Sequence, residues 1–163
     1  MGVAIRDFTA TDGPAVEAVA LAAWQQYARV FDTFDRLAGR LKSIAALATE
    51  LELIVGELDG AVAGVVGYAP PGAPREPIFP DDWGVVRLLS VAPAARGRGL
   101  GRRLSEECIA RARRDGARAI GLHTSPVMTV ALPLYLRLGF VAVRALPDRN
   151  GVPYALYRLA LRA

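Results

Sequence analysis

The sequence predicts an α/β fold whose elements follow the order β-α-α-β-β-β-α-β-α-β-β. Three observations lead to this prediction. Apolar residues recur at helical spacing in some segments and form short β-branched or alternating runs in others. Glycine and proline clusters separate these segments. A glycine-rich loop also stands between a predicted strand and a predicted helix. A length of 163 residues predicts one domain, residues 1–163, that can bury a proper core.

The individual elements follow from period, capping residues and turn residues. The predicted strands are residues 3–8, 53–58, 61–68, 85–91, 119–124, 141–146 and 154–161. The predicted helices are residues 12–30, 32–49, 102–114 and 129–138. Asp59-Gly60 supplies the positive φ angles of a type I′ hairpin turn. Pro133 requires that the last helix either begins near Leu132 or bends there.

The stretch from Gly84 to Arg114 organises the rest of the chain, because strand, glycine loop and helix together can hold phosphate. The first amides of a helix lack helical partners and carry partial positive charge, and glycines let the backbone approach an anion. Four arginines add formal charge around this loop: Arg96, Arg98, Arg102 and Arg103. The loop is therefore a candidate phosphate site.

Two familiar glycine motifs do not fit this loop. A Walker A loop ends in Gly-Lys, but the only lysine of the chain is Lys42, far upstream. A dinucleotide-binding loop requires a third glycine at the position that Arg102 occupies.

The sequence pattern that this loop does match is Arg-x-x-Gly-x-Gly, over residues 96–101. It resembles the acetyl-CoA loop of the GNAT superfamily of N-acetyltransferases. Residues 131–140, ALPLYLRLGF, resemble the A-x-x-L-Y-x-x-x-G-F helix and turn of the same family. The resemblance implies a mixed, mostly antiparallel sheet with helices on both faces. It also implies that the fourth and fifth strands splay apart and hold CoA between them.

By this resemblance the chain is an acetyl-CoA-dependent N-acetyltransferase that acts on a primary amine of a small molecule or peptide by direct attack. The backbone of Leu89, Ser90 and Val91 would pair with pantetheine. The loop residues would hold the pyrophosphate: Arg96, Gly97, Arg98, Gly99, Leu100, Gly101 and Arg102. Tyr135 matches the tyrosine that often protonates the CoA sulfur, and its phenol has a suitable pKa. A tyrosine that only packs and positions CoA is the alternative.

Two departures from the family pattern leave questions open. Met128 stands where many members have an asparagine, and the fourth strand carries no carboxylate that could serve as general base. The remaining candidates for the base are Glu57, Asp81, Asp82, His123 and a chain of water molecules. The missing carboxylate also leaves an alternative function, a CoA-binding regulatory or interaction domain without turnover.

The acceptor amine is expected to bind between the first two helices and the proline-rich loop, residues 70–83. The aromatic residues that could line this pocket are Trp24, Tyr27, Phe31, Phe34, Tyr68 and Trp83. Several of them also suit an ordinary hydrophobic core.

Composition excludes several other classes. Net charge is +4 and the isoelectric point is about 9.7, but the arginines cluster without interleaved aromatics, so no nucleic-acid partner is expected. No apolar run approaches the ~20 residues of a membrane span, and the first residues do not resemble a signal peptide. A single cysteine, Cys108, and a single histidine predict no disulfide and no metal site. We expect a cytoplasmic location and, from the C-terminal edge strand, a possible homodimer.

Overall fold

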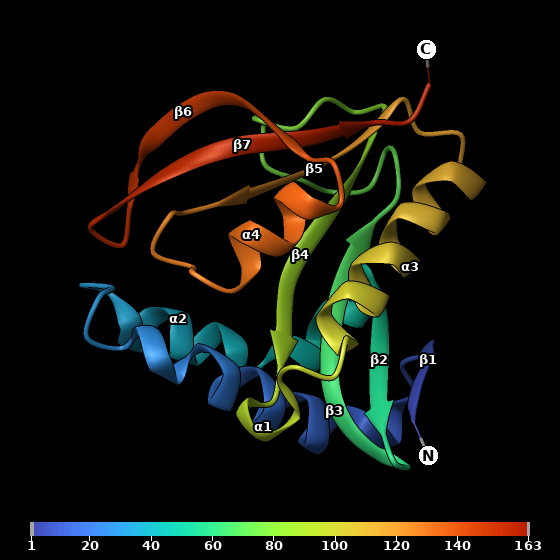
Figure 1. Ribbon diagram of the computed structural model, residues 1–163, viewed down its shortest axis with the longest axis vertical. Helices are drawn as coiled ribbons and strands as arrows, with labels where there is room; N and C mark the ends of the chain where they lie inside the picture. Colours follow the sequence, from blue (N-terminus) through green and yellow to red (C-terminus); the bar gives the residue numbers. More distant parts are fainter. Residues whose placement is uncertain (1, 163) are drawn as a thin grey trace.

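The computed structural model describes residues 2–162 and contains one seven-stranded sheet in the order β1-β2-β3-β4-β5-β7-β6 (Figure 1). The strands are β1 (Val3–Asp7), β2 (Glu52–Leu58), β3 (Ala61–Ala69), β4 (Trp83–Val91), β5 (Ala119–Thr124), β6 (Val141–Arg149) and β7 (Val152–Ala160). The α-helices are α1 (Gly13–Trp24), α2 (Phe34–Leu41), α3 (Leu100–Arg114) and α4 (Ala131–Arg137). Short 3₁₀ turns are η1 (Ala10–Asp12), η2 (Gln25–Tyr27), η3 (Ile44–Thr49) and η4 (Pro93–Ala95).

Helices cover both faces of the sheet, as the resemblance implied. One core cluster joins α1 and α2 to the sheet through residues such as Val16, Leu41 and Val85. The other joins α3 and α4 to the opposite face through Leu104, Cys108 and Tyr135. Cys108 is fully buried and belongs to this core. The fold is therefore α/β, with a mixed and mostly antiparallel sheet.

The only parallel pair in the described sheet is β4 with β5, and it is short. Trp83, Gly84 and Val85 pair with residues 119–121, and the pairing ends there. Val86, Arg87, Ser90 and Val91 pair with β3 alone, and Leu88 and Leu89 have no partner in the register of either neighbouring strand. The two strands thus separate toward the carboxyl end of β4, which confirms the predicted splay.

A β-bulge lies in this unpaired part of β4. Leu88 has a φ angle of 55°, which is uncommon for a residue with a side chain, and the register against β3 shifts between Val65 and Gly67. Backbone in such a conformation persists only where its surroundings hold it, and it is typical of functional sites. The bulge therefore marks this segment of β4 as a candidate functional site.

The two hairpin turns follow from their residues. Asp59 and Gly60 have φ angles of 52° and 85°, as a type I′ turn requires. Asn150 and Gly151 have φ angles of 53° and 77°, so β6 and β7 continue almost to this turn. The predicted strands 141–146 and 154–161 were too short at this end.

Several helix boundaries differ from the predictions. The segment predicted as one helix, residues 32–49, is α2 followed by η3, because hydrophobic spacing does not distinguish one helix from two short pieces on one core. The predicted helix 12–30 likewise ends as an α-helix at Trp24 and continues in η2. Helix α4 begins at Ala131, so Pro133 lies in its first turn, where its missing N–H has no helical partner to lose.

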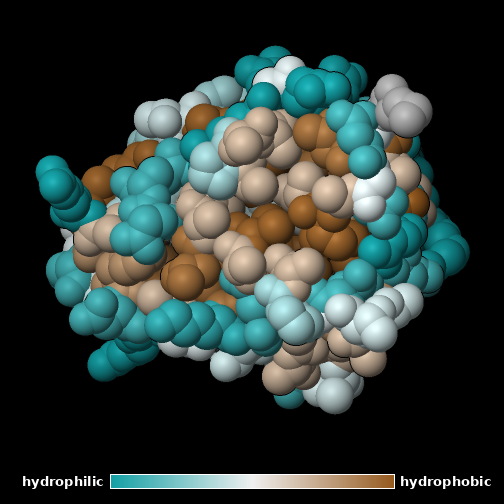
Figure 2. All heavy atoms as spheres, turned by 90° about the horizontal axis from the view of Figure 1, so that it is seen from below, coloured by the Kyte–Doolittle hydropathy of each residue, from teal (hydrophilic) through white to brown (hydrophobic). Residues whose placement is uncertain are grey.

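Not all large hydrophobic side chains are buried. In the view from below, hydrophobic residues gather in the middle of the face and hydrophilic residues surround them (Figure 2). The exposed large hydrophobic residues are Val30, Val130, Leu136, Val141 and Val143. Within residues 2–162, no helix has the length and apolar character needed to cross a membrane.

Candidate functional site

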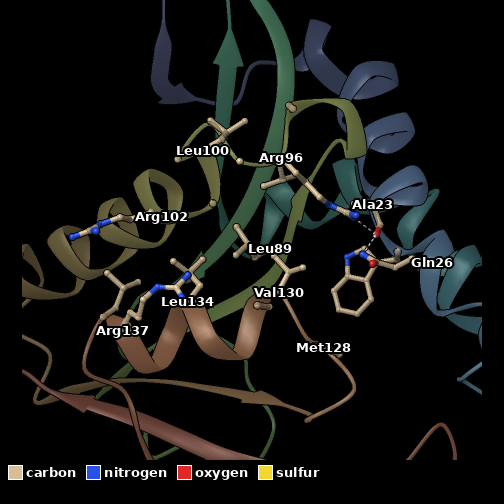
Figure 3. A pocket seen from close by; sticks show the side chains of 18 of the residues that line it. Ala23, Gln26, Leu89, Arg96, Leu100, Arg102, Met128, Val130, Leu134 and Arg137 are labelled. Carbon is tan, nitrogen blue, oxygen red and sulfur yellow. Dashed lines mark hydrogen bonds between the residues drawn. The ribbon is translucent and has the colours of Figure 1, made fainter.

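A cavity of about 400 Å³ lies where β4, the glycine loop, the start of α3, the end of α1 and α4 come together (Figure 3). Its walls contain predicted loop residues on one side and α4 residues on the other. The lining residues are Ala23, Trp24, Gln26, Tyr27, Leu89, Val91, Ala95, Arg96, Gly97, Gly99, Leu100, Gly101, Arg102, Met128, Val130, Ala131, Leu134, Arg137 and Leu138. The structure therefore brings together the two sequence motifs that lie about forty residues apart.

The glycine loop lets the backbone form part of the cavity wall. Gly97 and Gly99 have φ angles of 80° and 82°, which glycine adopts most readily, and Gly99 caps α3. Helix α3 begins at Leu100 rather than at the predicted Arg102, because Gly99 makes the turn immediately before it. The first helical bond here joins the Arg103 amide to the Gly99 carbonyl, so the preceding amides of the first turn lack helical partners.

Gly101 has a different role, because it lies inside the first turn of α3 with no positive φ angle. A Cβ atom at this position would lie 3.4 Å from Leu134 Cδ2 and 3.6 Å from Val91 Cγ2. Both of these neighbours line the cavity. A side chain at Gly101 would therefore take up space between α3, β4 and α4.

The predicted loop arginines have three different environments. Arg96 donates from Nη2 to the Ala23 carbonyl at 3.2 Å, so it ties the loop to the end of α1 (Figure 3). Arg102 lines the cavity while its Nε donates to Glu106 at 3.2 Å on the exposed face of α3. Arg98 is exposed and is not among the lining residues. Of the predicted loop arginines, only Arg96 and Arg102 thus line the cavity.

The predicted β4 residues also divide. Leu89 and Val91 line the cavity, whereas Ser90 is 1% exposed and faces α1. Ser90 Oγ accepts a hydrogen bond from Trp24 Nε1 at 3.0 Å and donates one to the Leu88 carbonyl at 3.0 Å. Alternation along a strand accounts for this division. The Ser90 side chain therefore positions Trp24 beside the bulge.

Tyr135 lies on α4, on the helix that contributes Ala131, Leu134 and Leu138 to the wall. The residue itself is 6% exposed, is not among the lining residues, and packs edge-on against Phe140 with ring centroids 5.7 Å apart. Burial raises the pKa of its phenol well above the ordinary value, so Tyr135 keeps its proton at neutral pH. A protonated phenol can donate a proton or a hydrogen bond and cannot act as a base at this pH.

None of the lining residues is an aspartate or glutamate. Glu57 pairs with Arg6 at 2.9 Å, and Asp82 pairs with Arg118 at 2.9 Å. Asp81 does not line the cavity either. The structure thus places the three carboxylates considered as general bases outside the cavity wall.

His123, the remaining candidate, lies in a polar cluster beside β5. Its ring stacks on Phe79 at 6.0 Å and packs against Tyr154 at 5.5 Å between ring centroids. Its Nε2 is 3.7 Å from Glu76 Oε1 and 3.4 Å from Arg149 Nη1. Burial, with the arginine charge adding to it, lowers the pKa of His123 to about 4. The ring is therefore neutral at pH 7 and a weak base.

The aromatic residues predicted for the acceptor pocket do not all lie in one place. Trp24 and Tyr27 line the cavity, and Phe31 stacks behind Tyr27 with centroids 5.6 Å apart. Tyr68 lies on the opposite face of the sheet, where its hydroxyl donates to Asp115 at 2.8 Å. The prediction for Tyr68 was wrong, because strand alternation turns its side chain toward α3.

Several cavity residues escaped the sequence analysis, among them Gln26 after α1 and Arg137 at the end of α4. Gln26 lies between two aromatic residues that were singled out, and Arg137 lies inside the second motif. Neither residue type nor spacing distinguishes them from solvent-facing helix residues. Their role in the wall depends on how α1 and α4 meet across β4.

Comparison with known proteins agrees with this geometry. The sequence model of the acetyltransferase (GNAT) family matches residues 17–140. The mycothiol acetyltransferase of Cellulomonas flavigena is 34% identical over 116 residues, which are 63% of this chain and 32% of that protein. This chain therefore matches only about a third of that relative's length.

Solved structures share the fold over nearly the whole chain. A GNAT family acetyltransferase from Brucella melitensis, in complex with acetyl-CoA, has a TM-score of 0.67 at 24% identity, covering 99% of this chain and 89% of that one. An N-acetyltransferase from Staphylococcus aureus has a TM-score of 0.76 at 18% identity, covering 98% and 99%. The two motifs, the splayed strands and the family match together lead to one conclusion: the chain belongs to the acetyltransferase (GNAT) family.

Proposed function

We propose that this protein is an acetyl-CoA-dependent N-acetyltransferase that moves an acetyl group to a primary amine of a small molecule or peptide by direct attack. The observation that carries this proposal is the cavity at the splayed end of β4, enclosed by both family motifs. Membership in the family and the acetyl-CoA complex of the Brucella relative support the same function.

The residues of the cavity wall suit the chemical groups of acetyl-CoA. The unpartnered amides at the start of α3 suit a pyrophosphate, and the dipole of this fifteen-residue helix favours an anion there. Arg96 and Arg102 add positive charge at the same end. Between Leu89 and Val91 the β4 backbone has no β5 partner, so it can pair with an extended pantetheine. Apolar residues of α4 face this strand across the cavity, Leu134 among them.

When bound, acetyl-CoA supplies an activated thioester whose acetyl group the amine attacks. In this proposal a backbone amide at the β4 bulge donates to the carbonyl oxygen as charge develops on it. Tyr135 holds the proton that the departing sulfur requires. Because no lining residue is a carboxylate, the amine releases its proton to water or reacts as the free amine.

The same lack of a carboxylate favours a second candidate function, a CoA-binding regulatory or interaction domain without turnover. The two functions agree on binding and differ on chemistry. Acetyl-CoA affinity alone therefore cannot separate them, and an acceptor assay is needed.

The test is a screen of amino acids, polyamines, aminoglycosides and short peptides with acetyl-CoA, in which thiol release is measured. Calorimetry on the same preparation measures acetyl-CoA binding. The enzyme predicts binding together with thiol release that depends on at least one amine. Tight binding with no release for any amine would favour the regulatory domain, and no binding would overturn both.

A further inference from the structure

Arg87 occupies the strand position beside the β4 bulge, where the sequence analysis found no carboxylate. It precedes Leu88, whose φ angle is 55°, and pairs across the sheet with Gly67. Val85, two residues earlier, belongs to the core under α1 and α2. Alternation places Arg87 on that same face, away from α3.

Charged neighbours confirm this location. The electrostatic interactions of Arg87 are with Arg40 on α2, Glu50 after η3 and Glu76 in the loop before β4. Arg87 and Arg40 also act on His123 of β5. Arg87 therefore lies between α2, the proline-rich loop and the splayed strands, on the side where the acceptor is expected.

The guanidinium of Arg87 lacks a partner, although it is partly buried. Over residues 2–162 no hydrogen bond or ion pair of its side chain is found, and burial lowers its pKa. Other partly buried arginines are satisfied: Arg75 donates to backbone carbonyls, and Arg111 to three carboxylates. The Arg87 nitrogens are not among the buried polar atoms without a hydrogen bond, so they reach solvent and are open to a ligand beside the bulge.

The acidic residues nearby do not supply that partner. Glu76 is engaged by Arg149, whose Nη2 and Nη1 lie 2.7 and 3.1 Å from its two oxygens. Glu50 is exposed and forms no ion pair within the described chain. Arg40 adds a second positive charge to the same region. The local field therefore favours an anionic ligand and disfavours a polycation.

The phosphates of CoA do not fit this role. The glycine loop that suits them follows Val91, and the four residue steps from Arg87 to Val91 span roughly 13 Å of strand. Arg87 is instead adjacent to the bulge where the proposed reaction takes place. A planar guanidinium binds a carboxylate through two parallel hydrogen bonds.

We propose that the acceptor is a small primary amine that also carries a carboxylate, as an amino acid does, and that Arg87 binds this carboxylate. This inference rests on the proposed transferase function. With the carboxylate held by Arg87, an amine only a few bonds away lies at the bulge, beside the thioester. Arg40 supports the same choice by repelling polyamines and other cations.

The test compares each common amino acid with its carboxamide, which keeps the amine and the side chain but removes the negative charge. At least one amino acid should be acetylated with a kcat/KM roughly 10- to 100-fold above that of its carboxamide, the range expected for hydrogen bonds to a charged group. The carboxamide has the less basic amine and so more of the reactive free form at pH 7, which works against the expected result.

Variants identify the residue responsible. Arg87→Gln should remove most of the preference for the carboxylate by raising KM, and Arg87→Lys should retain part of it. The matched control is Arg113→Gln on the exposed side of α3, outside the cavity, which should keep the preference. Acetyl-CoA affinity and the circular dichroism spectrum should stay unchanged in all three, which separates a local effect from misfolding.

Two results would overturn the inference in distinguishable ways. Equal or faster acetylation of carboxamides or polyamines, or an unchanged preference in Arg87→Gln, would leave the transferase function standing and reject the acceptor class. No thiol release with any amine, carboxylated or not, would reject the proposed function, and this inference with it.

Discussion

The phenol of Tyr135 is protonated and buried, so its value to catalysis can be tested by removing one oxygen atom. Tyr135→Phe keeps the ring that packs against Phe140. If the phenol protonates the departing sulfur, kcat should fall by roughly 10²- to 10⁴-fold, the usual scale of general acid catalysis. Acetyl-CoA affinity should barely change, because the glycine loop is untouched.

The pH profile gives a second prediction for the same variant. Because burial raises the pKa of Tyr135 above its ordinary value, the phenol stays protonated at every pH up to about 10. Parent and variant should therefore have rate profiles of the same shape, offset by a constant factor. Tyr157→Phe, a buried tyrosine of the same core, is the control and should keep its activity. Near-normal turnover in Tyr135→Phe would eliminate the acid role.

Gly101 provides a test of the phosphate site that separates binding from stability. Gly101→Ala adds a methyl group 3.4 Å from Leu134 in the cavity wall. Acetyl-CoA affinity should fall by calorimetry, while unfolding should shift by no more than about 1 kcal/mol, because alanine favours a helix. Gly39→Ala is the matched control, since its added Cβ meets no atom within 4 Å on α2. Equal affinities in both variants would reject this placement of the pyrophosphate.

His123 should make the stability of the protein depend on pH. Its pKa is about 4 when folded, against 6.5 for the free side chain, so the unfolded chain binds the extra proton. The stabilisation is therefore complete above pH 6.5 and is lost as the pH falls toward 4. Acidification from pH 7 to pH 5 should cost about 2 kcal/mol through this residue.

The measurement is urea unfolding of the parent and of His123→Phe, which cannot bind the proton but keeps a ring between Phe79 and Tyr154. The variant should lose less stability than the parent between these two pH values. Identical losses would mean that carboxylates alone account for the acid sensitivity.

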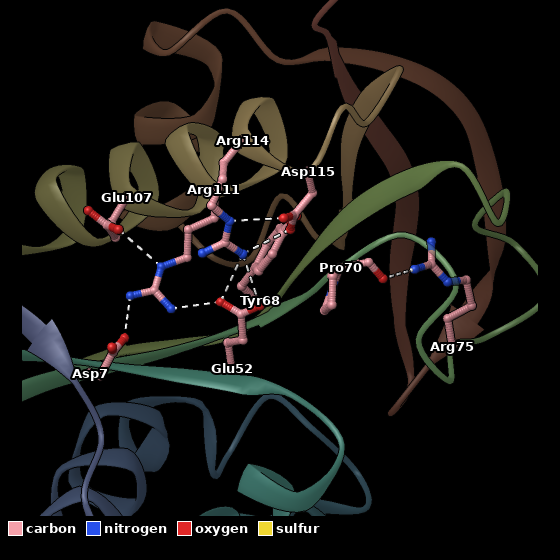
Figure 4. A network of polar contacts seen from close by, with 9 residues as sticks. All are labelled: Asp7, Glu52, Tyr68, Pro70, Arg75, Glu107, Arg111, Arg114 and Asp115. Carbon is pink, nitrogen blue, oxygen red and sulfur yellow. Dashed lines mark hydrogen bonds and ion pairs between the residues drawn. The ribbon is translucent and has the colours of Figure 1, made fainter.

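At the scale of elements, an ion-pair network fastens α3 to the first two strands (Figure 4). Arg111 donates to Asp7 of β1, Glu52 of β2 and Glu107 of its own helix, and is itself only 11% exposed. Arg114 continues the network to Glu52 and Asp115. The network lies at the carboxyl end of α3, so it fixes the helix whose other end lines the cavity.

Arg111→Met keeps the apolar stem and removes the hydrogen bonds. The free energy of unfolding should fall by about 1–2 kcal/mol, because the three carboxylates left behind can partly rehydrate. Arg118→Gln is the control, since its pair with Asp82 is more than half exposed on both sides. It should cost under about 0.5 kcal/mol in the same denaturant titration. Equal effects of the two substitutions would contradict a special role for the network.

At the scale of the whole molecule, β6 is an edge of the sheet, and its residues 141–145 are all exposed. A free edge that carries Val141 and Val143 can pair with another strand. The prediction that the C-terminal strand is an edge was wrong, because β7 pairs with β5 on one side and β6 on the other. A homodimer would instead use β6, and Val143→Lys would oppose pairing by placing charge on this edge. Light scattering at micromolar concentration should give a dimer mass for the parent and a monomer mass for the variant. A monomeric parent would contradict the prediction.

A feature of the fold or of the site can be predicted from the sequence when residues close together in the chain produce it. The turns at Asp59-Gly60 and Asn150-Gly151 and the stop of α3 before Gly116 follow from residues that adopt positive φ angles. Two motifs identified the family: the glycine loop between its strand and helix, and the segment over residues 131–140. Each is a short stretch with a defined sequence pattern. Local chemistry thus determined the order of elements and the choice of the loop.

The tertiary structure decided what depends on contacts between distant segments. The bulge at Leu88, the hydrogen bond from Trp24 to Ser90 and the unpartnered state of Arg87 have no counterpart in hydrophobic periodicity. Strand alternation turned Tyr68 and Ser90 away from the cavity, although each has a residue type that suits a site. The sequence by itself determined which segments form the fold and which loop carries the family motif. Only packing across the splayed strands determined which side chains meet, because each of these contacts depends on the positions of several elements at once.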